Sequence, residues 1–394
     1  MNRRRFISGA LGVPACSLIL QRCSRPADRG LAATANKVNA PSGTPYPLVA
    51  LPGKAPLGQV YDRPPNYETP TSHLIGDRTY PYTNSEYYYV RYREADIRSI
   101  SRDDFRLRVG GESARTTLNL TLHDLQKFPR VEIGAVGECT GEGRGLVRPV
   151  VPGLPWTKGD LSCALWAGAS LKAVLEQAGV KPGAAQVAFK GGRIISLMKP
   201  EYWRACPLET VMQPDVLLAY EMNGADLPLW NGYPLRLVVP GAYAPVWVKQ
   251  VREVEIRSTP HPLEWSGRPI TPGELKTYSL ITTPPDGTLV PIASPVTLTG
   301  VAWDSGKGIA KVEISRDDGS TWEEAQIERS YGKYVWRIWH YILRTPPKGE
   351  FRILSRATSV DGETQPMDVS AEIVKAGARK NNAVRTYAAV LIGV

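Results

Sequence analysis

The sequence predicts an α+β fold in two domains, in which a mixed first domain is followed by an all-β sandwich with immunoglobulin-like strand spacing. Length is the first observation, because 394 residues exceed what one ordinary hydrophobic core holds. Composition is the second, because 34 prolines and 36 glycines favour short strands and loops over long helices. The third is a change of pattern, since from Thr277 onward strands and Asp/Gly turns alternate roughly every ten residues.

A twin-arginine export signal is predicted over residues 1–35. Residues 3–7 read RRRFI, so that an arginine pair is followed by Phe6 and Ile7 at the expected offset, and an apolar stretch comes next. A short membrane anchor is the alternative, but glycines and a proline interrupt the apolar run, which is too short to span a bilayer. Lipidation of Cys16 is a further alternative. The signal predicts a protein exported to the periplasm.

Residues 36–85 are predicted to form an extended linker, because Pro, Gly, Ser, Thr and Asn dominate their composition. The first domain is expected over residues 86–262. Aromatic content and alternation predict strands there, and apolar residues at helical spacing predict helices. The expected strands are 86–94, 103–111, 131–139, 215–224, 233–241 and 246–256, and the expected helices are 121–129, with a threonine cap, and 169–180, ended by Gly179.

The second domain is expected over residues 263–394. Its predicted strands lie within 295–304, 309–327, 334–343 and 351–362. The region lacks the Cys–Trp–Cys signature of true immunoglobulins, so the prediction rests on strand spacing alone. Composition changes between about 257 and 275, which places the boundary there.

A formal charge of +10 favours anionic partners. Nucleic acid is not expected, because the sequence has no Lys/Arg-rich run with interleaved aromatic residues. A small anion or an acidic protein fits this balance better. The four histidines are scattered and no CxxC occurs, so the sequence offers little support for a zinc or non-haem iron site.

Cys139 lies in a glycine-rich loop, GECTGEGRGLVRPVVPGLPW, which spans residues 137–156. Glycine lets the backbone approach a bulky ligand, while backbone N–H groups and arginines hold oxyanions. One thiolate can complete a metal sphere that a cofactor mainly supplies. Two alternatives remain open at this point, a buried structural cysteine and a nucleophilic cysteine with a histidine base.

Ten stretches together resemble the molybdenum-containing sulfite oxidase family, and within it bacterial sulfite dehydrogenases and the molybdenum subunit of the sulfur-oxidising multienzyme system. They run in the family's order from Tyr87 to the C-terminus and include YYVRY, ECTGEGR, VRPVVPGLPW, LLAYEMNG, NGYPLRLVVPG, WVKQV and VEISRDDGSTW. The resemblance implies a molybdopterin domain followed by an immunoglobulin-like dimerisation domain, and therefore a homodimer.

The resemblance also implies site residues. Cys139 would ligate molybdenum, and the catalytic positions would be Arg91, Arg144 and Trp156. The pterin and its phosphate would be bound by Tyr89, Arg91, Arg93, Asn231, Arg236 and Lys249, with Val90 on the same strand. Lys311 matches, less closely, a basic residue that many members contribute from the second domain.

Four positions depart from the family pattern. Asn231 stands where eukaryotic members have a histidine, although bacterial relatives often have asparagine. Arg93 stands where members usually carry a histidine, and Arg193 replaces an aspartate. The tyrosine expected near Arg268 and Ile270 is missing. Because that tyrosine helps to hold substrate in relatives, its absence bears on whether sulfite itself is accepted.

The resemblance implies an exported molybdenum enzyme that transfers an oxygen atom to a sulfur compound. The expected substrate is sulfite, another small sulfur anion, or sulfane sulfur on a sulfur-carrier protein. A c-type cytochrome would accept the electrons, since no haem segment is present. A reductive enzyme acting on a sulfoxide or another oxyanion is one alternative, and a non-catalytic β-sandwich binding module is the other.

Overall fold

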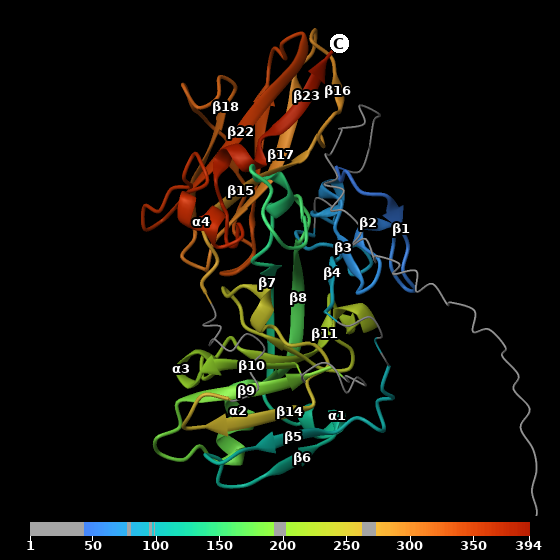
Figure 1. Cartoon of the computed structure of the whole chain (residues 1–394), viewed down its shortest axis with the longest axis vertical. Helices are drawn as coiled ribbons and strands as arrows, with labels where there is room; N and C mark the ends of the chain where they lie inside the picture. Colours follow the sequence, from blue (N-terminus) through green and yellow to red (C-terminus); the bar gives the residue numbers. More distant parts are fainter. Residues whose placement is uncertain (1–42, 77–79, 94–96, 98, 193–201, 262–272) are drawn as a thin grey trace, which may run out of the picture. The chain divides into compact units, whose positions relative to one another are not determined.

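The computed structural model describes residues 43–394 apart from 77–79, 94–96, 98, 193–201 and 262–272. The predicted export signal and the predicted domain boundary lie outside these residues. Figure 1 shows the strands and helices of the described part. Within it, no helix has both the length and the apolar character needed to cross a membrane.

Residues 43–85, expected to form an extended linker, instead contribute three strands to a small sheet. The sheet has the order β1-β2-β3-β4, with bounds Leu48–Val49, Leu57–Tyr61, Asn66–Glu68 and Val90–Arg91. Leu57, Tyr67, Val90 and Tyr92 form its buried cluster. These strands are hard to recognise in a sequence rich in turn-forming residues, because they are short and each carries only one to three apolar side chains. The expected strand at 86–94 shortens to β4, because its first residues form a turn in which the N–H groups of Tyr87 and Tyr88 donate to the carbonyl of Asn84.

Two further sheets build the rest of residues 43–261, the part that we call the first half, as distinct from residues 273–394, the second half. One has the order β10-β9-β14-β5-β6 and the other the order β12-β11-β8-β7, with β13 paired to β11. Their bounds are β5 Leu107–Gly110, β6 Leu118–Leu120, β7 Arg130–Glu138, β8 Leu161–Ser170, β9 Gln186–Gly191, β10 Tyr202–Pro207, β11 Leu217–Met222, β12 Ala225–Asp226, β13 Arg236–Val238 and β14 Glu253–Arg257.

Helices are few and short in this half. In α1 (Leu122–Leu125), Thr121 and Asp124 form a reciprocal capping box, as the predicted threonine cap requires. Helix α2 (Leu171–Ala178) ends at Gly179, whose φ of 74° favours glycine, so this prediction is also confirmed. The third helix is α3 (Leu208–Val211).

The expected strand over 246–256 is wrong for its first half. Residues Ala244–Val246 form a 3₁₀ turn that contains Pro245, and strand β14 begins only at Glu253. The alternation of apolar and polar residues there has another cause. Val246 and Val248 pack into the core, whereas Lys249 lines a cavity.

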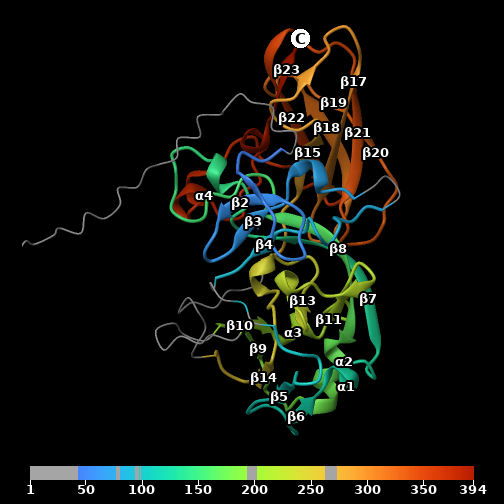
Figure 2. The ribbon, with the colours of Figure 1, turned by 90° about the vertical axis from the view of Figure 1, so that its right-hand side faces the viewer.

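Strands β7 and β8 are the long antiparallel pair that positions the glycine-rich loop. Their register runs from Arg130 opposite Ala169 to Glu138 opposite Leu161. Figure 2 shows them side by side. Because β7 ends at Glu138, Cys139 is the first residue beyond the strand.

The second half of the chain is the predicted β-sandwich. Its two sheets have the orders β15-β17-β21-β20 and β16-β23-β22-β18-β19. Trp339, Leu298 and Leu391 are buried in the core between them. The bounds are β15 Tyr278–Thr283, β16 Leu289–Val290, β17 Val296–Trp303, β18 Ile309–Ser315, β19 Glu323–Glu324, β20 Gln326–Ile327, β21 Arg337–Leu343, β22 Gly349–Ser359, α4 Ala371–Lys375 and β23 Ala389–Gly393.

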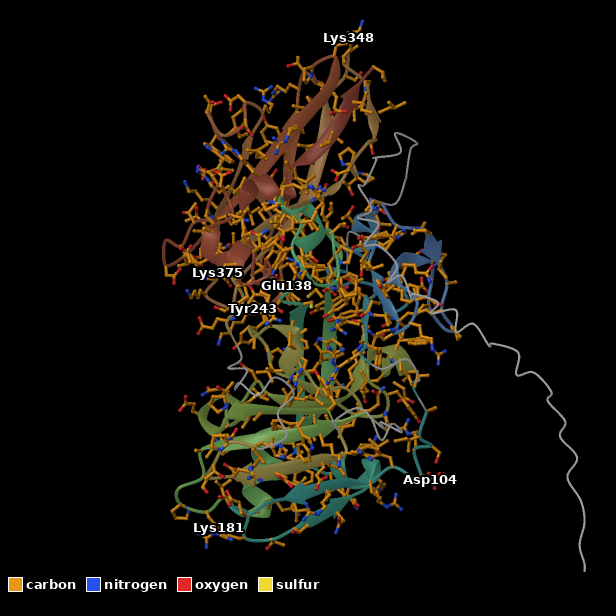
Figure 3. The ribbon with its side chains drawn as sticks, viewed as in Figure 1. Asp104, Glu138, Lys181, Tyr243, Lys348 and Lys375 are labelled. Atoms are coloured by element: carbon orange, nitrogen blue, oxygen red, sulfur yellow. The ribbon has the colours of Figure 1, made fainter. Side chains whose placement is uncertain are left out.

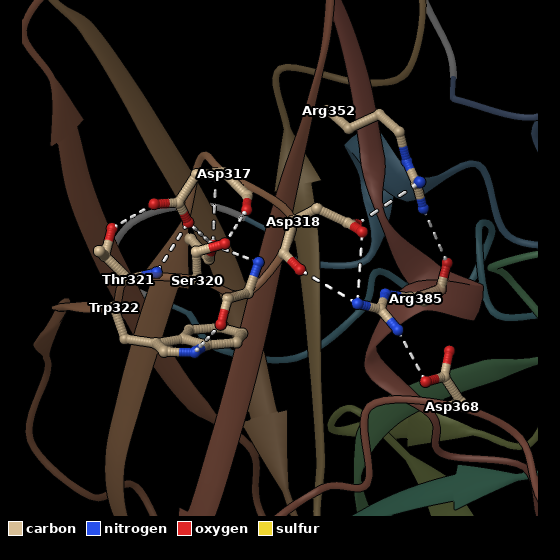
Figure 4. A network of polar contacts seen from close by, with 10 residues as sticks. Asp317, Asp318, Ser320, Thr321, Trp322, Arg352, Asp368 and Arg385 are labelled. Carbon is tan, nitrogen blue, oxygen red and sulfur yellow. Dashed lines mark hydrogen bonds and ion pairs between the residues drawn. The ribbon is translucent and has the colours of Figure 1, made fainter.

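The turn after β18 is held by the side chain of Asp317, which accepts hydrogen bonds from the backbone N–H of Thr321 at 2.9 Å and its hydroxyl at 2.6 Å. Arg385 ties this turn to the C-terminal segment, because its guanidinium lies 3.3 Å from Asp318 and 2.7 Å from Asp368 (Figure 4). The segment 371–382 lies between Asp368 and Arg385 in the chain and contacts the glycine-rich loop, where the N–H of Lys380 donates to the carbonyl of Thr140 at 2.8 Å.

Candidate functional site

The glycine-rich loop is folded back on itself at Cys139. The Cys139 N–H donates to the carbonyl of Asp160 at 3.0 Å, and the N–H of Glu142 donates to the carbonyl of Cys139 at 3.2 Å. Gly143 has φ of 71°, and a Cβ there would collide with the hydroxyl of Tyr387. The close approach that the loop's glycines predict is therefore made in part to the second half of the chain.

Cys139 opens into a cavity of about 760 Å³. Nearly all the predicted site residues line it, although their positions in the sequence range from 89 to 249. They are Tyr89, Arg91, Arg93, Cys139, Arg144, Trp156, Arg236 and Lys249. Tyr243 and Lys375, labelled in Figure 3, line it as well. The cavity is large enough for a cofactor together with a small substrate.

The cavity wall is strongly basic. Nine of the described residues that line it are arginines or lysines, and none is an aspartate or glutamate. Six of the nine come from the first half of the chain, and Lys375, Arg379 and Lys380 come from the second. A cavity whose lining is this basic and partly shielded from water favours anionic ligands.

The surroundings of Cys139 raise the pKa of its thiol. Burial raises its pKa, the nearby charge of Asp160 raises it further, and Arg91 opposes the shift. No histidine is among the described residues that line the cavity, so a nucleophilic Cys–His pair has no base there. Cys163 and Cys206 are buried in the core, whereas Cys139 faces the cavity, which separates it from structural cysteines. Coordination of a metal would ionise this thiol directly.

Arg144 is tied to its surroundings more firmly than the sequence suggests. Its Nε donates to the carbonyl of Gly377 at 2.8 Å, and one terminal nitrogen donates to the carbonyl of Leu154 at 3.2 Å. It therefore links the glycine-rich loop to the second half of the chain as well as lining the cavity. Arg91 donates one bond, at 2.5 Å, to the carbonyl of its neighbour Tyr92.

Arg236 and Lys249 form the corner of the cavity where a pterin phosphate is expected. Arg236 is 2% exposed, lies over the rings of Trp166 and Trp247, and donates from one terminal nitrogen to the carbonyl of Asn231 at 3.0 Å. Its buried Nε has no partner among the described residues. Lys249 donates to the carbonyls of Arg91 at 3.2 Å and Trp230 at 2.8 Å.

These two cations fit an anionic group. Neither has a carboxylate among its described hydrogen bonds, and burial followed by the charge of Arg236 lowers the pKa of Lys249 well below its usual range. An anion at this corner would compensate both charges and give the unpaired nitrogen a partner. The residues present therefore suit a pterin phosphate, with Cys139 at a different position on the same wall as the metal ligand.

Asn231, Val90 and Lys311 do not line the cavity. Asn231 is fully buried behind the wall, and its carboxamide contacts Lys54 and the carbonyl of Tyr89. Val90 packs in the cluster of the small sheet. Lys311 lies on β18 and pairs with Glu313 at 3.0 Å. Arg193, Arg268 and Ile270 are outside the described residues.

Sequence reasoning missed several cavity residues. Arg204, Tyr202 and Tyr243 come from the first half, while Lys375, Arg379 and Lys380 come from the segment after β22. Lys380 has a φ of 57° and its N–H donates to the carbonyl of Thr140 at 2.8 Å, next to Cys139. The clustered basic residues of 375–380 were the available signal, since three of these six residues are cations and none is acidic.

Comparisons with known proteins agree with this geometry. A family model described as "Oxidoreductase molybdopterin binding domain" matches residues 94–265, and one described as "Mo-co oxidoreductase dimerisation domain" matches residues 271–383. The first model implies a molybdenum–molybdopterin cofactor. Sulfite oxidase of Gallus gallus is 31% identical over 356 residues, which cover 82% of this chain and 76% of that protein.

Mitochondrial sulfite oxidase of Rattus norvegicus is 34% identical over 304 residues, which cover 70% of this chain and 55% of that protein. The chain thus spans about half the length of the mammalian relatives it matches. Among solved structures, the sulfane dehydrogenase SoxCD from Paracoccus pantotrophus superposes with a TM-score of 0.68 at 26% identity, covering 82% of this chain and 84% of that chain. The chain therefore belongs to the sulfite oxidase family of molybdopterin-binding oxidoreductases, with a molybdopterin domain followed by a dimerisation domain.

Proposed function

We propose that the protein oxidises a small anionic sulfur compound by oxygen-atom transfer. One observation carries this proposal: Cys139, the candidate metal ligand, opens into the same cavity as nine basic side chains with no acidic side chain among the described lining residues. A metal bound at that thiol would meet an anion held by the wall. Sulfite is such an anion, and sulfite oxidases are among the relatives.

When bound, the molybdenum cofactor supplies the oxygen and accepts the two electrons. This chain's own residues do the rest. Arg236 and Lys249 bind the pterin phosphate, while Arg91 and Arg93 place positive charge on the substrate anion. Trp156 is fully buried and forms an apolar wall that keeps bulk water out. In the net reaction the sulfur gains one oxygen from water, and two electrons and two protons are released.

The substrate proposal extends to sulfane sulfur, free or on a sulfur-carrier protein. The structural relative is named a sulfane dehydrogenase, and the mouth of this cavity carries the exposed residues Lys375 and Arg379. The positive charges of Lys375 and Arg379 would attract an anionic substrate larger than sulfite, or an acidic carrier protein, before it reached Cys139.

The remaining parts of the proposal concern location and partners. The RRRFI sequence supports export by the twin-arginine route to the periplasm. A c-type cytochrome there would accept electrons one at a time. The match to a dimerisation domain supports a homodimer.

Replacement of Cys139 tests the proposal directly. Cys139→Ser should abolish sulfite or thiosulfate oxidation with cytochrome c, because a serine oxygen is a harder ligand than a thiolate. Cys206→Ala is the matched control, since that thiol is buried away from the cavity. Metal analysis of the periplasmic protein and circular dichroism accompany the assay. Wild-type turnover by the serine variant, or a wild-type protein without molybdenum, would contradict the proposal. Reduction of a sulfoxide without any sulfur oxidation would support the reductive alternative.

A further inference from the structure

Lys54 is a buried lysine in the segment between β1 and β2, outside both family matches. Lys54 is only 7% exposed to solvent. Its ammonium donates to the carbonyl of Ser85 at 2.6 Å, the carbonyl of Tyr88 at 3.0 Å and the carboxamide oxygen of Asn231 at 2.5 Å. A lysine ammonium has three N–H donors, so all three are used.

The partners of Lys54 form the back of the cavity wall. The carboxamide nitrogen of Asn231 donates to the carbonyl of Tyr89 at 3.4 Å, and the carbonyl of Asn231 accepts from Arg236 at 3.0 Å. Tyr89 and Arg236 both line the cavity. Lys54 is therefore one residue removed from the phosphate corner, and Asn231 is the residue between them.

Lys54 also adds charge to that corner. None of its three hydrogen-bond acceptors is a carboxylate. Burial, and after it the charge of Arg236, lowers the pKa of Lys54, while Glu86 acts in the opposite direction. Lys249 feels the charges of both Arg236 and Lys54. Three cations in a buried corner repel one another, so an anion bound there stabilises all three.

We propose that Lys54 is a positioning residue for the pterin-phosphate corner. It fixes the carboxamide of Asn231 and the backbone at Tyr88 and Tyr89, and through Asn231 it holds the guanidinium of Arg236 toward the cavity. The inference rests on the proposed function only in taking the anion at this corner to be the cofactor's phosphate. The N-terminal sheet is thereby a part of the cofactor site.

A purely structural role is the competing explanation, in which Lys54 only pins the N-terminal sheet to the domain. The two explanations differ in the loss of phosphate affinity that they predict when Lys54 and Asn231 are replaced together. A positioning role that acts through Asn231 predicts that replacing both residues costs no more phosphate affinity than replacing one. A role in sheet packing predicts a loss of melting temperature with no specific loss of phosphate affinity.

The experiment uses the full chain in two forms. Lys54→Met, Asn231→Leu and the double variant are purified with cofactor, and molybdenum and pterin per chain are measured. The same variants are prepared metal-free, and inorganic phosphate is titrated while the melting temperature is followed. Lys348→Met is the control, since Lys348 is exposed at the far end of the second domain (Figure 3). If Lys54→Met does not fold, Lys54→Gln removes the charge and keeps a donor.

We expect each single variant to bind phosphate ten- to hundredfold more weakly, the range that one charge-assisted hydrogen bond supports. The double variant should match the singles, molybdenum content should fall in all three, and Lys348→Met should resemble the wild type. Three outcomes would overturn the inference. The first is that Lys54→Met keeps wild-type phosphate affinity and molybdenum content, and the second is that the effects add in the double variant. The third is that phosphate does not raise the melting temperature of the metal-free wild type. A wild-type protein without molybdenum would instead contradict the proposed function.

Discussion

At the scale of single residues, Arg91 and Arg144 line the same cavity but are held differently. Arg144 donates to the carbonyls of Gly377 and Leu154, and the first of these contacts joins the two halves of the chain. The described hydrogen bond of Arg91 goes only to its neighbour Tyr92. Their removal should therefore have different consequences for stability, which the sequence alone did not predict.

We expect Arg91→Gln to lower kcat/KM for an anionic substrate about ten- to hundredfold with little change in unfolding free energy. Arg144→Gln should lower kcat/KM as well, and should also destabilise the protein by about 1–3 kcal/mol, because two partly buried carbonyls lose a charged donor. Steady-state kinetics and urea unfolding of both variants provide the measurements. Equal stability of the two variants would show that the contact with Gly377 contributes little in solution.

The residues that could be predicted from the sequence are those within a recognisable local stretch. Cys139, Arg144 and Trp156 lie in one loop, and Arg236 and Lys249 lie in short stretches that resemble the family. Lys54 and Arg204 could not be predicted, because each reaches the site only through tertiary packing of a segment that has no pattern of its own. Asn231 differs from these residues, since its stretch resembles the family while its side chain lies behind the cavity wall.

At the scale of elements, strand β7 connects the glycine-rich loop to the sandwich. Glu138, its last residue, is 1% exposed and accepts a hydrogen bond from the indole N–H of Trp303, on strand β17, at 2.9 Å. Burial raises the pKa of Glu138 to about 8, although the bond from Trp303 opposes the shift. The folded protein therefore holds a proton at this position that the unfolded chain, with an ordinary carboxyl pKa of 4.5, releases earlier.

The stability from this proton is fully present below pH 4.5 and is lost as the pH rises through about 8. Glu138→Gln keeps an acceptor for Trp303 and cannot ionise. We expect the unfolding free energy of the metal-free variant, relative to wild type, to increase steadily from pH 5 to pH 8. Urea unfolding of both proteins across this pH range measures the difference in unfolding free energy. The contributions of the other buried carboxyl groups are the same in both proteins and cancel in this difference. Parallel curves for the two proteins would show that Glu138 does not titrate in this way.

Elements with strong local signals could be predicted, and weak ones could not. The cap at Thr121 and the glycine after α2 set two helix ends, and the alternating strands of the sandwich lie where expected. The small sheet of residues 48–91 could not be predicted, because its strands are two to five residues long and are stabilised by pairing and by one shared cluster. Short strands leave no periodicity to detect.

At the scale of the whole molecule, both halves of the chain build one basic cavity. Among the residues that the structure describes, six basic residues of the first half and three of the second line it, and the formal charge of the chain is +10. Arg93 is among the six. Such a field concentrates every small anion near the mouth, including anions that are not substrates.

We therefore expect free sulfite to be oxidised slowly, with strong competitive inhibition by sulfate and phosphate and weaker inhibition by chloride. A divalent anion has a more favourable Coulomb energy with each cation than chloride has, and this difference in energy is larger where water is excluded. At constant ionic strength, added sulfate should raise KM and leave kcat unchanged, because general screening is then held fixed. Arg379→Gln and Lys375→Gln at the mouth should weaken this inhibition, whereas Lys348→Gln should not alter it. A cytochrome c assay in a sulfate series at fixed ionic strength provides the measurement. Rapid sulfite turnover that is indifferent to sulfate would show that the wall charges are compensated by the bound cofactor, and that the cavity does not select for larger or more highly charged sulfur anions.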